Sequence, residues 1–415
     1  MIDKPLTVLV SVYACGPSWG SEIGMGWNWV IHLSNYCQLH VITEAAFKED
    51  IEKKIPELNL KFNPIFYYND IGDKGRRLFW KQGSFLFYRY YKKWQQKALQ
   101  IAENIIKNNH IDIVHQLNMI GYREPGYLWK INTIPYIIGP IGGYEQFPLA
   151  YFSLLNTRDK VFYGARNIIN YLQSNLLSRP KKAYTKAVFA IVATKSGYRK
   201  IQRYTTNNPI LISEVGAYPN IGEDKLFANK KEKEKFVITW VGILSGRKGL
   251  PLALKAIAKS KFKNKIILNV VGYGNNKKDF KKLAKSLQLE NVVWHGKLPN
   301  VEAKRIIQGS NLFFLTSLLE ATSTVVFEAL QSKTPVLCHD ICGFGSVIDE
   351  NCGVKIPLIN PEKSVELFSL EIDNLIENPE KLYQMQKGCK KTIKDHYWEN
   401  KGLKMMKLYK RCLES

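Results

Sequence analysis

The sequence lacks the features that mark membrane-spanning and secreted proteins. Its 415 residues contain no charge-free apolar run of about 20 residues, the length that crosses a bilayer as a helix. It does not begin with the basic and then apolar residues of a signal peptide. Its seven cysteines are an odd number spread along the chain, which argues against a disulfide framework. These absences lead us to expect a cytoplasmic protein with reduced thiols.

Acidic residues are few relative to basic ones. The chain has 36 aspartates and glutamates against 60 lysines and arginines, which gives a formal net charge of +24. Such a charge favours anionic partners, among them nucleic acid, acidic phospholipid and nucleotide diphosphates. A lysine-rich genome would produce part of the same excess in any protein. Because the chain has no recognised nucleic-acid motif, we expect no nucleic-acid partner.

The length and the order of apolar segments predict two domains. A chain of 415 residues exceeds what one hydrophobic core usually supports. In each half, short apolar segments alternate with stretches long enough for helical crossovers, which is typical of parallel α/β sheets. The strand candidates of the first half are 7–12, 40–43, 111–115 and 135–139, and a second alternation starts at 236. The best linker is 215–220, followed by the charge run 230–235.

Two glutamates in the second alternation stand on either side of seven uncharged residues. The apolar run 313–317 indicates a buried parallel strand, and Ser323 or Thr324 can cap the helix that follows. Glu320 then lies in the loop and Glu328 in the first turns of that helix. Both would sit at the carboxyl edge of a parallel sheet, where α/β folds bind ligands beside helix N-termini that attract phosphate. A ligand with sugar hydroxyls, a diphosphate and a ribose suits this edge.

Further motifs accompany this pair in a fixed order. They are the strand, glycine loop and basic pair 240–250, the strand ends 270–274 and 293–296, and the downstream segments 329–336, 343–345 and 351–354. The series resembles the donor-site signature of the retaining group 1 glycosyltransferases, also called glycosyltransferase family 4. The resemblance covers the C-terminal half nearly throughout and the N-terminal half in patches. It implies the GT-B fold, an α/β architecture of two Rossmann-like, doubly wound domains that face each other across a cleft.

The resemblance also implies how the chain divides. The acceptor-side domain is expected over residues 1–215, and the donor-binding domain over 216–394. In the GT-B fold the last helix commonly returns to the N-terminal domain. The helical pattern of residues 395–415 is placed to do so.

The resemblance assigns roles to the charged residues of the donor side. Glu320 would contact donor-sugar hydroxyls, and Glu328 would hold the nucleotide ribose. Arg247 and Lys248 would neutralise the departing diphosphate, whose charge must be stabilised as the glycosidic bond breaks. The family often has an arginine where Ile243 stands in this chain. The other donor-side candidates are Gly20, Ser21, Gly24, Gly242, His295, Gly296, Lys297, Leu298, Thr322, Ser323 and Thr324.

No metal and no other cofactor is expected. Many nucleotide-sugar enzymes hold a metal with Asp-x-Asp, and this motif is absent from the sequence. The group formed by Cys338, His339, Cys342 and Cys352 lacks the paired spacing of a zinc site. Lysine, arginine and helix N-termini would then carry the phosphate charge.

The first half offers acceptor-side candidates that follow successive strands. They are His115, Arg123, Gly142, Gly143 and Glu145. The family pattern often carries His-x-His where this chain has His115 followed by Leu117. A supporting histidine in the core fits His115 equally well.

Residues 74–97 contain eight basic and eight aromatic residues and no acidic one. At helical spacing, Trp80, Phe87, Tyr91 and Trp94 form one stripe, as in a helix that lies on an anionic membrane surface. A core-packed helix with a solvated basic face fits the same pattern. The membrane alternative implies a peripheral position on the cytoplasmic face of the inner membrane and suits a lipid-linked acceptor.

The resemblance implies a retaining hexosyltransferase. Its donor would be a nucleotide diphosphate sugar, UDP- or GDP-linked, and its acceptor a lipid-linked saccharide or glycolipid of cell-surface polysaccharide biosynthesis. The departures at Ile243 and Leu117 leave a second interpretation open, a catalytically inactive sugar-nucleotide-binding module of a polysaccharide assembly complex. Intact Arg247, Lys248 and Glu320 favour the enzyme.

Overall fold

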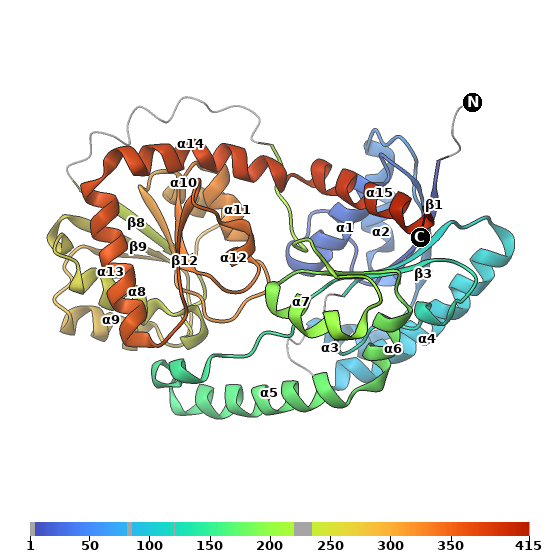
Figure 1. The fold of residues 1–415 in the computed structure, drawn as a ribbon, viewed down its shortest axis with the longest axis horizontal. Helices are drawn as coiled ribbons and strands as arrows, with labels where there is room; N and C mark the ends of the chain where they lie inside the picture. The colour runs from blue at the N-terminus through green and yellow to red at the C-terminus, as the bar shows by residue number, and fades with distance from the viewer. Residues whose placement is uncertain (1–4, 81–84, 120, 220–234, 415) are drawn as a thin grey trace. The chain divides into compact units, whose positions relative to one another are not determined.

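The computed structural model describes residues 5–80, 85–119, 121–219 and 235–414 (Figure 1). The chain divides into two compact units. Unit 1 comprises Met1–Tyr144, Tyr171–Gly216 and Trp398–Ser415, and unit 2 comprises Glu145–Asn170 and Ala217–Tyr397. The segment Glu145–Asn170, expected in the first domain, thus belongs to the second unit.

Unit 1 is built on a seven-stranded parallel sheet with the order β3-β2-β1-β4-β5-β6-β7. Its strands are β1 Thr7–Val12, β2 Gln38–Glu44, β3 Ile65–Asn69, β4 Ile113–Asn118, β5 Tyr136–Ile141, β6 Phe189–Val192 and β7 Ile210–Leu211. Its helices are α1 Ser21–Leu33, α2 Lys48–Lys54, α3 Asp73–Trp80, α4 Phe85–Asn108, α6 Ser178–Lys186, α7 Lys195–Ile201 and α15 Trp398–Glu414. Helix α5, Thr157–Leu176, begins in unit 2 and ends in unit 1. The central strand β1 is almost completely buried, because helices cover a parallel sheet on both faces.

Unit 2 has a six-stranded parallel sheet with the order β10-β9-β8-β11-β12-β13. Its strands are β8 Phe236–Val241, β9 Ile266–Val271, β10 Val292–Gly296, β11 Leu312–Leu315, β12 Val336–His339 and β13 Gly353–Ile356. Its helices are α8 Leu250–Lys259, α9 Lys277–Ser286, α10 Asn300–Gln308, α11 Thr324–Gln331, α12 Phe344–Val347, α13 Pro361–Glu377 and α14 Pro379–Asp395. Two parallel α/β sheets confirm the predicted fold class.

Unit 2 includes the segment Glu145–Asn170 because the apolar side chains of that segment complete its core. Tyr151 and Leu155 are buried in one cluster with Leu252 and Leu318. The Tyr151 hydroxyl also lies 2.6 Å from the Ser364 hydroxyl at the start of α13. No repeat or motif in the sequence predicts this packing, because the segment has the pattern of an ordinary crossover after β5.

The last helix, α15, packs on α1 within unit 1. The Trp398 ring meets the Trp29 ring edge-on, with centroids 5.4 Å apart. Lys401 is buried between these indoles, and its ammonium donates to the Ser213 hydroxyl at 3.0 Å. Burial lowers the pKa of Lys401 to about 7. The C-terminal residues therefore complete the core of unit 1.

Most of the aromatic stripe predicted to lie on lipid belongs to the core of unit 1. Phe87, Tyr91 and Trp94 are buried, and their rings meet Tyr13 edge-on with centroids 4.9 to 5.9 Å apart. Trp80 alone of the four is exposed. The core-packed alternative is therefore correct for the other three, which cannot contact a bilayer. None of the described helices is long and apolar enough to span one.

Candidate functional site

The basic pair Arg247 and Lys248 lies in a tight 3-10 turn between β8 and α8. Gly249 ends this turn in the left-handed conformation, with φ of 68°, which glycine adopts without strain. A Cβ atom at Gly249 would lie 2.2 Å from the Thr316 carbonyl oxygen. Only glycine therefore lets this turn approach the end of β11 so closely.

Hydrogen bonds fasten the turn to the loop that follows β11. The Leu318 amide donates to the Arg247 carbonyl at 2.8 Å, and the Thr316 hydroxyl donates to the Lys248 carbonyl at 3.0 Å. The indole of buried Trp240 donates to the Thr316 hydroxyl, also at 3.0 Å. Because buried polar groups are costly to leave unpaired, these bonds fix the position of both cations.

Glu320 contacts both cations. Its Oε1 atom accepts a hydrogen bond from Arg247 at 3.0 Å and forms an ion pair with the Lys248 ammonium. Lys248 is only 8% exposed, so the cluster is largely shielded from bulk water. Shielding strengthens the attraction between charges, and a fixed cluster needs little reorganisation when charge develops nearby. The sequence prediction that these three residues act together is consistent with this geometry.

Backbone contacts hold the ends of neighbouring strands beside the cation turn. The Gly242 amide donates to the Val271 carbonyl at 3.0 Å, and the Gly272 amide donates to the Gly296 carbonyl at 2.8 Å. A Cβ atom at Gly272 would lie 1.8 Å from the Gly242 carbonyl oxygen. The predicted glycine positions thus allow β8, β9 and β10 to present one compact carboxyl edge.

Glu328 lies in α11 and Glu320 in the preceding loop, as the sequence predicts. Ser323 occupies the N-cap position, but its hydroxyl accepts no bond from the helix, and the Val326 amide donates to the Ser323 carbonyl instead. The predicted side-chain cap by Ser323 or Thr324 is therefore wrong. Glu328 is half-buried and accepts a hydrogen bond from the Asn300 amide at 2.9 Å.

The loops that follow β11 and β12 touch each other next to Glu320. Thr322 is buried, and a Cβ atom at Gly343 would lie 1.8 Å from its hydroxyl oxygen. The Gly343 amide donates to the Ala321 carbonyl at 2.8 Å. This contact restricts the conformation of the loop that carries Glu320.

The segment after β10 lies at the same sheet edge. His295 is half-buried, and its Nε2 atom lies 2.9 Å from the Asn269 amide oxygen. Gly296 ends the strand with φ of 76°, and the Lys297 ammonium stands over the Tyr273 ring. Leu298 is half-buried. The role of this backbone in base recognition stays a prediction from the resemblance.

Two hydroxyl groups beside the cluster were not singled out from the sequence. The Ser317 hydroxyl is buried at the end of the β11 segment, and the Ser245 hydroxyl precedes the cation turn. Neither has a hydrogen-bond partner among the described residues. Buried hydroxyl groups that a protein leaves unpaired are available to a ligand or to water. Their place after strands was the only sequence signal for them.

The first part of α5 also approaches the cluster. Burial raises the pKa of Tyr163. The nearby charge of Arg247 lowers this pKa, and the charge of Glu320 raises it. The Leu155 side chain packs against the turn, since a Cβ atom at Gly246 would lie 2.4 Å from it. Sequence reasoning missed these contacts because about 90 residues separate the two segments, and only tertiary packing joins them.

Glu145 is the acceptor-side candidate whose position differs from expectation. It is buried and belongs to unit 2, where its carbonyl accepts a hydrogen bond from Arg166 at 3.3 Å. Burial raises the pKa of the Cys342 thiol well above its usual range, and the charges of Glu145 and Glu320 raise it further. Glu145 therefore accompanies the donor-side cluster rather than the candidates of unit 1.

The other candidates in unit 1 follow its strands. Gly20 is the N-cap residue of α1, which begins at Ser21. A Cβ atom at Gly24 would lie 2.0 Å from the Trp19 carbonyl oxygen, so this position requires glycine. The glycine loop therefore forms a tight turn that places the N-terminus of α1 at the carboxyl edge of β1.

Arg123 and the glycines after β5 lie near one another in unit 1. The Arg123 guanidinium donates to the Gln173 amide oxygen at 2.6 Å and stacks over the Tyr122 ring. The Tyr122 amide donates to the Gly142 carbonyl at 3.3 Å, and Gly143 is left-handed with φ of 85°. The structure thus brings these three candidates to the same edge of the unit 1 sheet.

His115 lies inside unit 1. It is fully buried on β4, its Nε2 atom donates to the Gly139 carbonyl at 2.8 Å, and its Nδ1 atom accepts from the Tyr409 hydroxyl at 2.7 Å. Burial lowers the pKa of His115 to about 4, which keeps the ring neutral. With both nitrogens bonded inside the core, the core alternative fits His115 better than an acceptor contact.

We expect His115 to make the protein less stable as the pH falls. The unfolded chain takes up the imidazole proton near pH 6.5 and the folded one only near pH 4, so protonation between these values favours unfolding. The loss should reach about 3 kcal/mol by pH 4. The variant His115→Asn should be less stable at pH 7.5 but lose less free energy of unfolding on acidification. Urea titrations at pH 7.5 and 5 measure both effects. His110→Asn, at an exposed histidine, is the control, and equal pH slopes for His115→Asn and wild type would contradict the assignment.

A metal site is not built by the residues that the structure describes. No group of three histidine, cysteine, aspartate or glutamate side chains among them could hold a metal ion. Cys338 and Cys352 are buried, and burial raises the pKa of Cys352 to about 12. These thiols therefore resist the deprotonation that metal binding requires.

Known proteins resemble this chain in sequence and in fold. Residues 222–392 match the family model of glycosyl transferases group 1. An uncharacterized glycosyltransferase of Methanocaldococcus jannaschii is 27% identical over 60% of this chain and 63% of its own length. The lipopolysaccharide glucosyltransferase WaaG of Escherichia coli K12 is 28% identical over 33% of this chain and 37% of its own length. The matches thus span less than two thirds of both relatives.

Solved structures share the fold over nearly the whole chain. The apo form of the lipopolysaccharide outer core galactosyltransferase WaaB superposes with a TM-score of 0.65 at 13% identity, covering 98% of this chain and 100% of WaaB. Anabaena HepE in complex with UDP and glucose superposes with a TM-score of 0.53 at 14% identity, covering 97% and 99% of the two chains. At these identities the likeness establishes the fold alone.

The two parallel sheets and the structural likeness define the GT-B fold. The ordered donor-site motifs and the family match assign residues 222–392 to the group 1 glycosyltransferases.

Proposed function

We propose that this protein is a retaining glycosyltransferase that moves a hexose-type sugar from a nucleotide diphosphate sugar to a lipid-linked saccharide or glycolipid in cell-surface polysaccharide biosynthesis. The observation that carries the proposal is the shielded cluster of Arg247, Lys248 and Glu320. It combines two cations for a diphosphate with a carboxylate for sugar hydroxyls. A protein that only binds anions has no need of this carboxylate between its cations.

A metal-free donor site is consistent with this cluster. When a nucleotide sugar binds, its diphosphate would take the place of Glu320 as the partner of Arg247 and Lys248, and Glu320 would turn to the sugar hydroxyls. The unpaired hydroxyls of Ser245 and Ser317 would be further donors to this ligand. The HepE structure contains UDP and glucose, which supports UDP as the first nucleotide to test.

The proposed reaction takes place on one face of the sugar. The bond between the anomeric carbon and the diphosphate oxygen breaks, and a bond to the acceptor oxygen forms on the same face. The acceptor proton passes to an oxygen of the departing diphosphate, so both atoms and charge balance. Arg247 and Lys248 would stabilise the negative charge that grows on the diphosphate as the bond breaks.

The names of related proteins support the proposed acceptor. WaaG is a lipopolysaccharide glucosyltransferase, and WaaB is a lipopolysaccharide outer core galactosyltransferase. Both names describe enzymes that act on a saccharide joined to a lipid. We therefore propose the same acceptor class here and a peripheral association with the membrane that holds it.

Calorimetry of the metal-free protein with UDP, GDP, ADP and CMP tests the donor site. We expect selective binding of UDP or GDP. We expect Glu328→Ala to weaken it about tenfold, because loss of one carboxylate contact to the ribose costs roughly 1.5 kcal/mol. Glu366→Ala, at a half-buried glutamate of α13 that pairs with Lys363, is the matched control and should bind like wild type.

The same titrations separate the two interpretations of the chain. No binding of any nucleotide would overturn the proposed function. Binding without turnover of the donor, across a panel of nucleotide sugars and glycolipid acceptors, would instead support the inactive binding module. Turnover would exclude that alternative.

A further inference from the structure

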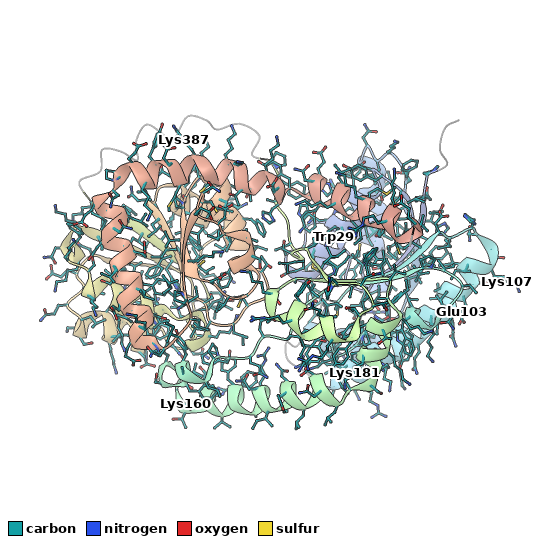
Figure 2. The ribbon with its side chains drawn as sticks, viewed as in Figure 1. Trp29, Glu103, Lys107, Lys160, Lys181 and Lys387 are labelled. Atoms are coloured by element: carbon teal, nitrogen blue, oxygen red, sulfur yellow. The ribbon has the colours of Figure 1, made fainter. Side chains whose placement is uncertain are left out.

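Two tryptophans of unit 1 are exposed to solvent. Trp19 stands just before helix α1 and is 44% exposed, and Trp80 ends helix α3 and is 53% exposed. By contrast, Trp29 lies inside unit 1 and is completely buried (Figure 2). Tryptophan has the largest side chain, so each exposed ring leaves a large apolar surface in contact with water. A contiguous patch of such surface marks an interaction site.

The two exposed rings lie side by side. Their centroids are 5.2 Å apart, and the angle between the ring planes is 35°. The rings come from separate segments of the chain, Trp19 from the loop after β1 and Trp80 from the helix after β3. Aromatic rings at this distance attract each other, so each ring helps to hold the other in place. The pair forms one apolar surface, which we call the tryptophan platform.

The residues around Trp19 hold its ring in one orientation. Ser18, the preceding residue, adopts the left-handed conformation with φ of 63°, which is uncommon and strained for a residue other than glycine. The Trp19 indole N–H donates to the Asp50 carboxylate at 3.2 Å. A Cβ atom at Gly16 would lie 3.0 Å from the Trp19 ring, so glycine there leaves room for the ring. Trp19 is therefore positioned at the surface by its neighbours.

Phe79 connects Trp80 to the core of unit 1. The Trp80 ring meets the Phe79 ring edge-on, with centroids 5.2 Å apart. The Phe79 ring in turn meets the ring of buried Tyr13 edge-on, with centroids 5.5 Å apart. Tyr13 directly follows β1. The platform therefore lies at the carboxyl end of β1, on the sheet edge where parallel α/β folds bind ligands.

The platform has the chemistry of a carbohydrate-binding surface. A hexopyranose ring carries hydroxyl groups around its rim and axial C–H bonds on its faces, so a face of the sugar is apolar. The electron-rich face of an indole attracts these C–H groups. The Asp50 carboxylate stands at the edge of Trp19 and has lone pairs that can also accept hydrogen bonds from sugar hydroxyls. Aromatic surface with a precisely placed polar group is typical of small-molecule sites.

Two other partners suit the platform less well. Acidic phospholipids would come close to Asp50 and Glu49 in the first turn of α2, and like charges repel each other. In a symmetric dimer the patch would face a copy of itself, which would bring two Asp50 carboxylates together. An uncharged sugar meets neither obstacle, because its hydroxyl groups donate hydrogen bonds to a carboxylate.

We propose that the tryptophan platform stacks against a pyranose ring of the saccharide acceptor. The apolar face of the sugar would lie on Trp19 and Trp80, and a hydroxyl group at its rim would donate to Asp50. The inference rests on the proposed function, because it gives the saccharide part of the proposed acceptor a binding surface in unit 1. The nucleotide sugar would bind at the cation cluster of unit 2, so the two sites can be tested separately.

Saturation-transfer NMR of the full chain with free sugars tests the proposal. The sugars are the methyl glycosides of glucose, galactose and N-acetylglucosamine. We expect the strongest saturation on the axial ring protons of one pyranose face, because that face would lie on the indoles. Trp80→Ala should weaken binding about fivefold, the effect of losing one aromatic contact, and Trp80→Phe should weaken it less. Tyr171→Ala, which removes a ring that is 62% exposed elsewhere in unit 1, is the matched control and should bind like wild type.

Each other outcome contradicts the proposal. No saturation of any of the three sugars, or saturation that Trp80→Ala leaves unchanged, overturns it. So does a platform that binds no sugar but mediates a dimer or binding to phosphatidylglycerol vesicles that Trp80→Ala abolishes. Titration with UDP and GDP separates this failure from that of the proposed function, because Trp80→Ala should bind the nucleotide like wild type. If the platform binds sugars but the chain binds no nucleotide, the saccharide site stands and the proposed function fails.

Discussion

Replacing Lys248 with alanine should lower kcat by about 10²- to 10³-fold, the effect of removing one preorganised charge from a transition state. The dissociation constant for the nucleotide should rise by less than about tenfold, because Arg247 and backbone amides still contact the diphosphate. The difference arises because negative charge on the diphosphate grows as the glycosidic bond breaks, and Lys248 is held where that charge develops. Steady-state kinetics together with calorimetry of the same variant measure both quantities.

Two further variants make this test specific. Arg247→Ala shows how the two cations share the task, and we expect the smaller loss there because its side chain is more exposed than that of Lys248. Lys261→Ala removes an exposed lysine that pairs with Glu377 in the same unit and should leave both quantities unchanged. Equal losses in kcat and in nucleotide affinity for Lys248→Ala would show that the lysine binds the ground state and the transition state alike. The proposed role in leaving-group stabilisation would then be wrong.

Replacing Gly249 with alanine should disrupt the cation turn. The added Cβ atom would lie 2.2 Å from the Thr316 carbonyl oxygen. The alanine would also have to adopt the left-handed backbone conformation, with φ of 68°. The turn must therefore move away from β11, which breaks the bonds that position Lys248. We expect a loss of about 3 kcal/mol in the free energy of unfolding, from strain and a lost buried hydrogen bond. Nucleotide binding should also fall below detection.

The variant Gly296→Ala separates the cost of the left-handed backbone conformation from the cost of a steric clash with neighbouring atoms. Gly296 has a similar φ of 76°, but no atom lies within 4 Å of the Cβ position. We expect this control to lose only about 1 kcal/mol, the cost of the left-handed conformation for alanine. Urea unfolding of both variants gives the comparison. Similar losses at the two positions would show that contact with Thr316 does not set the conformation of the turn.

The donor-side cluster could be predicted from sequence because each of its parts is local. A strand, a glycine turn and a charged residue follow one another within a few positions at 240–250 and again at 313–328. In a parallel sheet the carboxyl ends of strands share one edge, so local order is enough to bring Lys248 and Glu320 together. The ion pair between them confirms that inference.

Other parts of the site depended on contacts that no local pattern contains. Glu145 and Tyr163 come from the first half of the sequence, yet they lie in the unit formed mainly by the second half. Their placement follows from the burial of Tyr151 and Leu155 against α8 and α13. Such packing depends on shape complementarity between segments far apart in sequence, which composition and periodicity do not record.

The sequence by itself determined the family, the parallel α/β architecture and the residues of the cation and carboxylate cluster, because motif order and strand topology are written along the chain. Tertiary structure alone decided which amphipathic helix exposes its apolar face to solvent. The aromatic helix α4 and the apolar helix α5 both carry an apolar stripe at helical spacing. One stripe is buried beneath Tyr13 and the other is exposed, since tertiary packing, rather than the periodicity of each helix, fixes the direction of its apolar face.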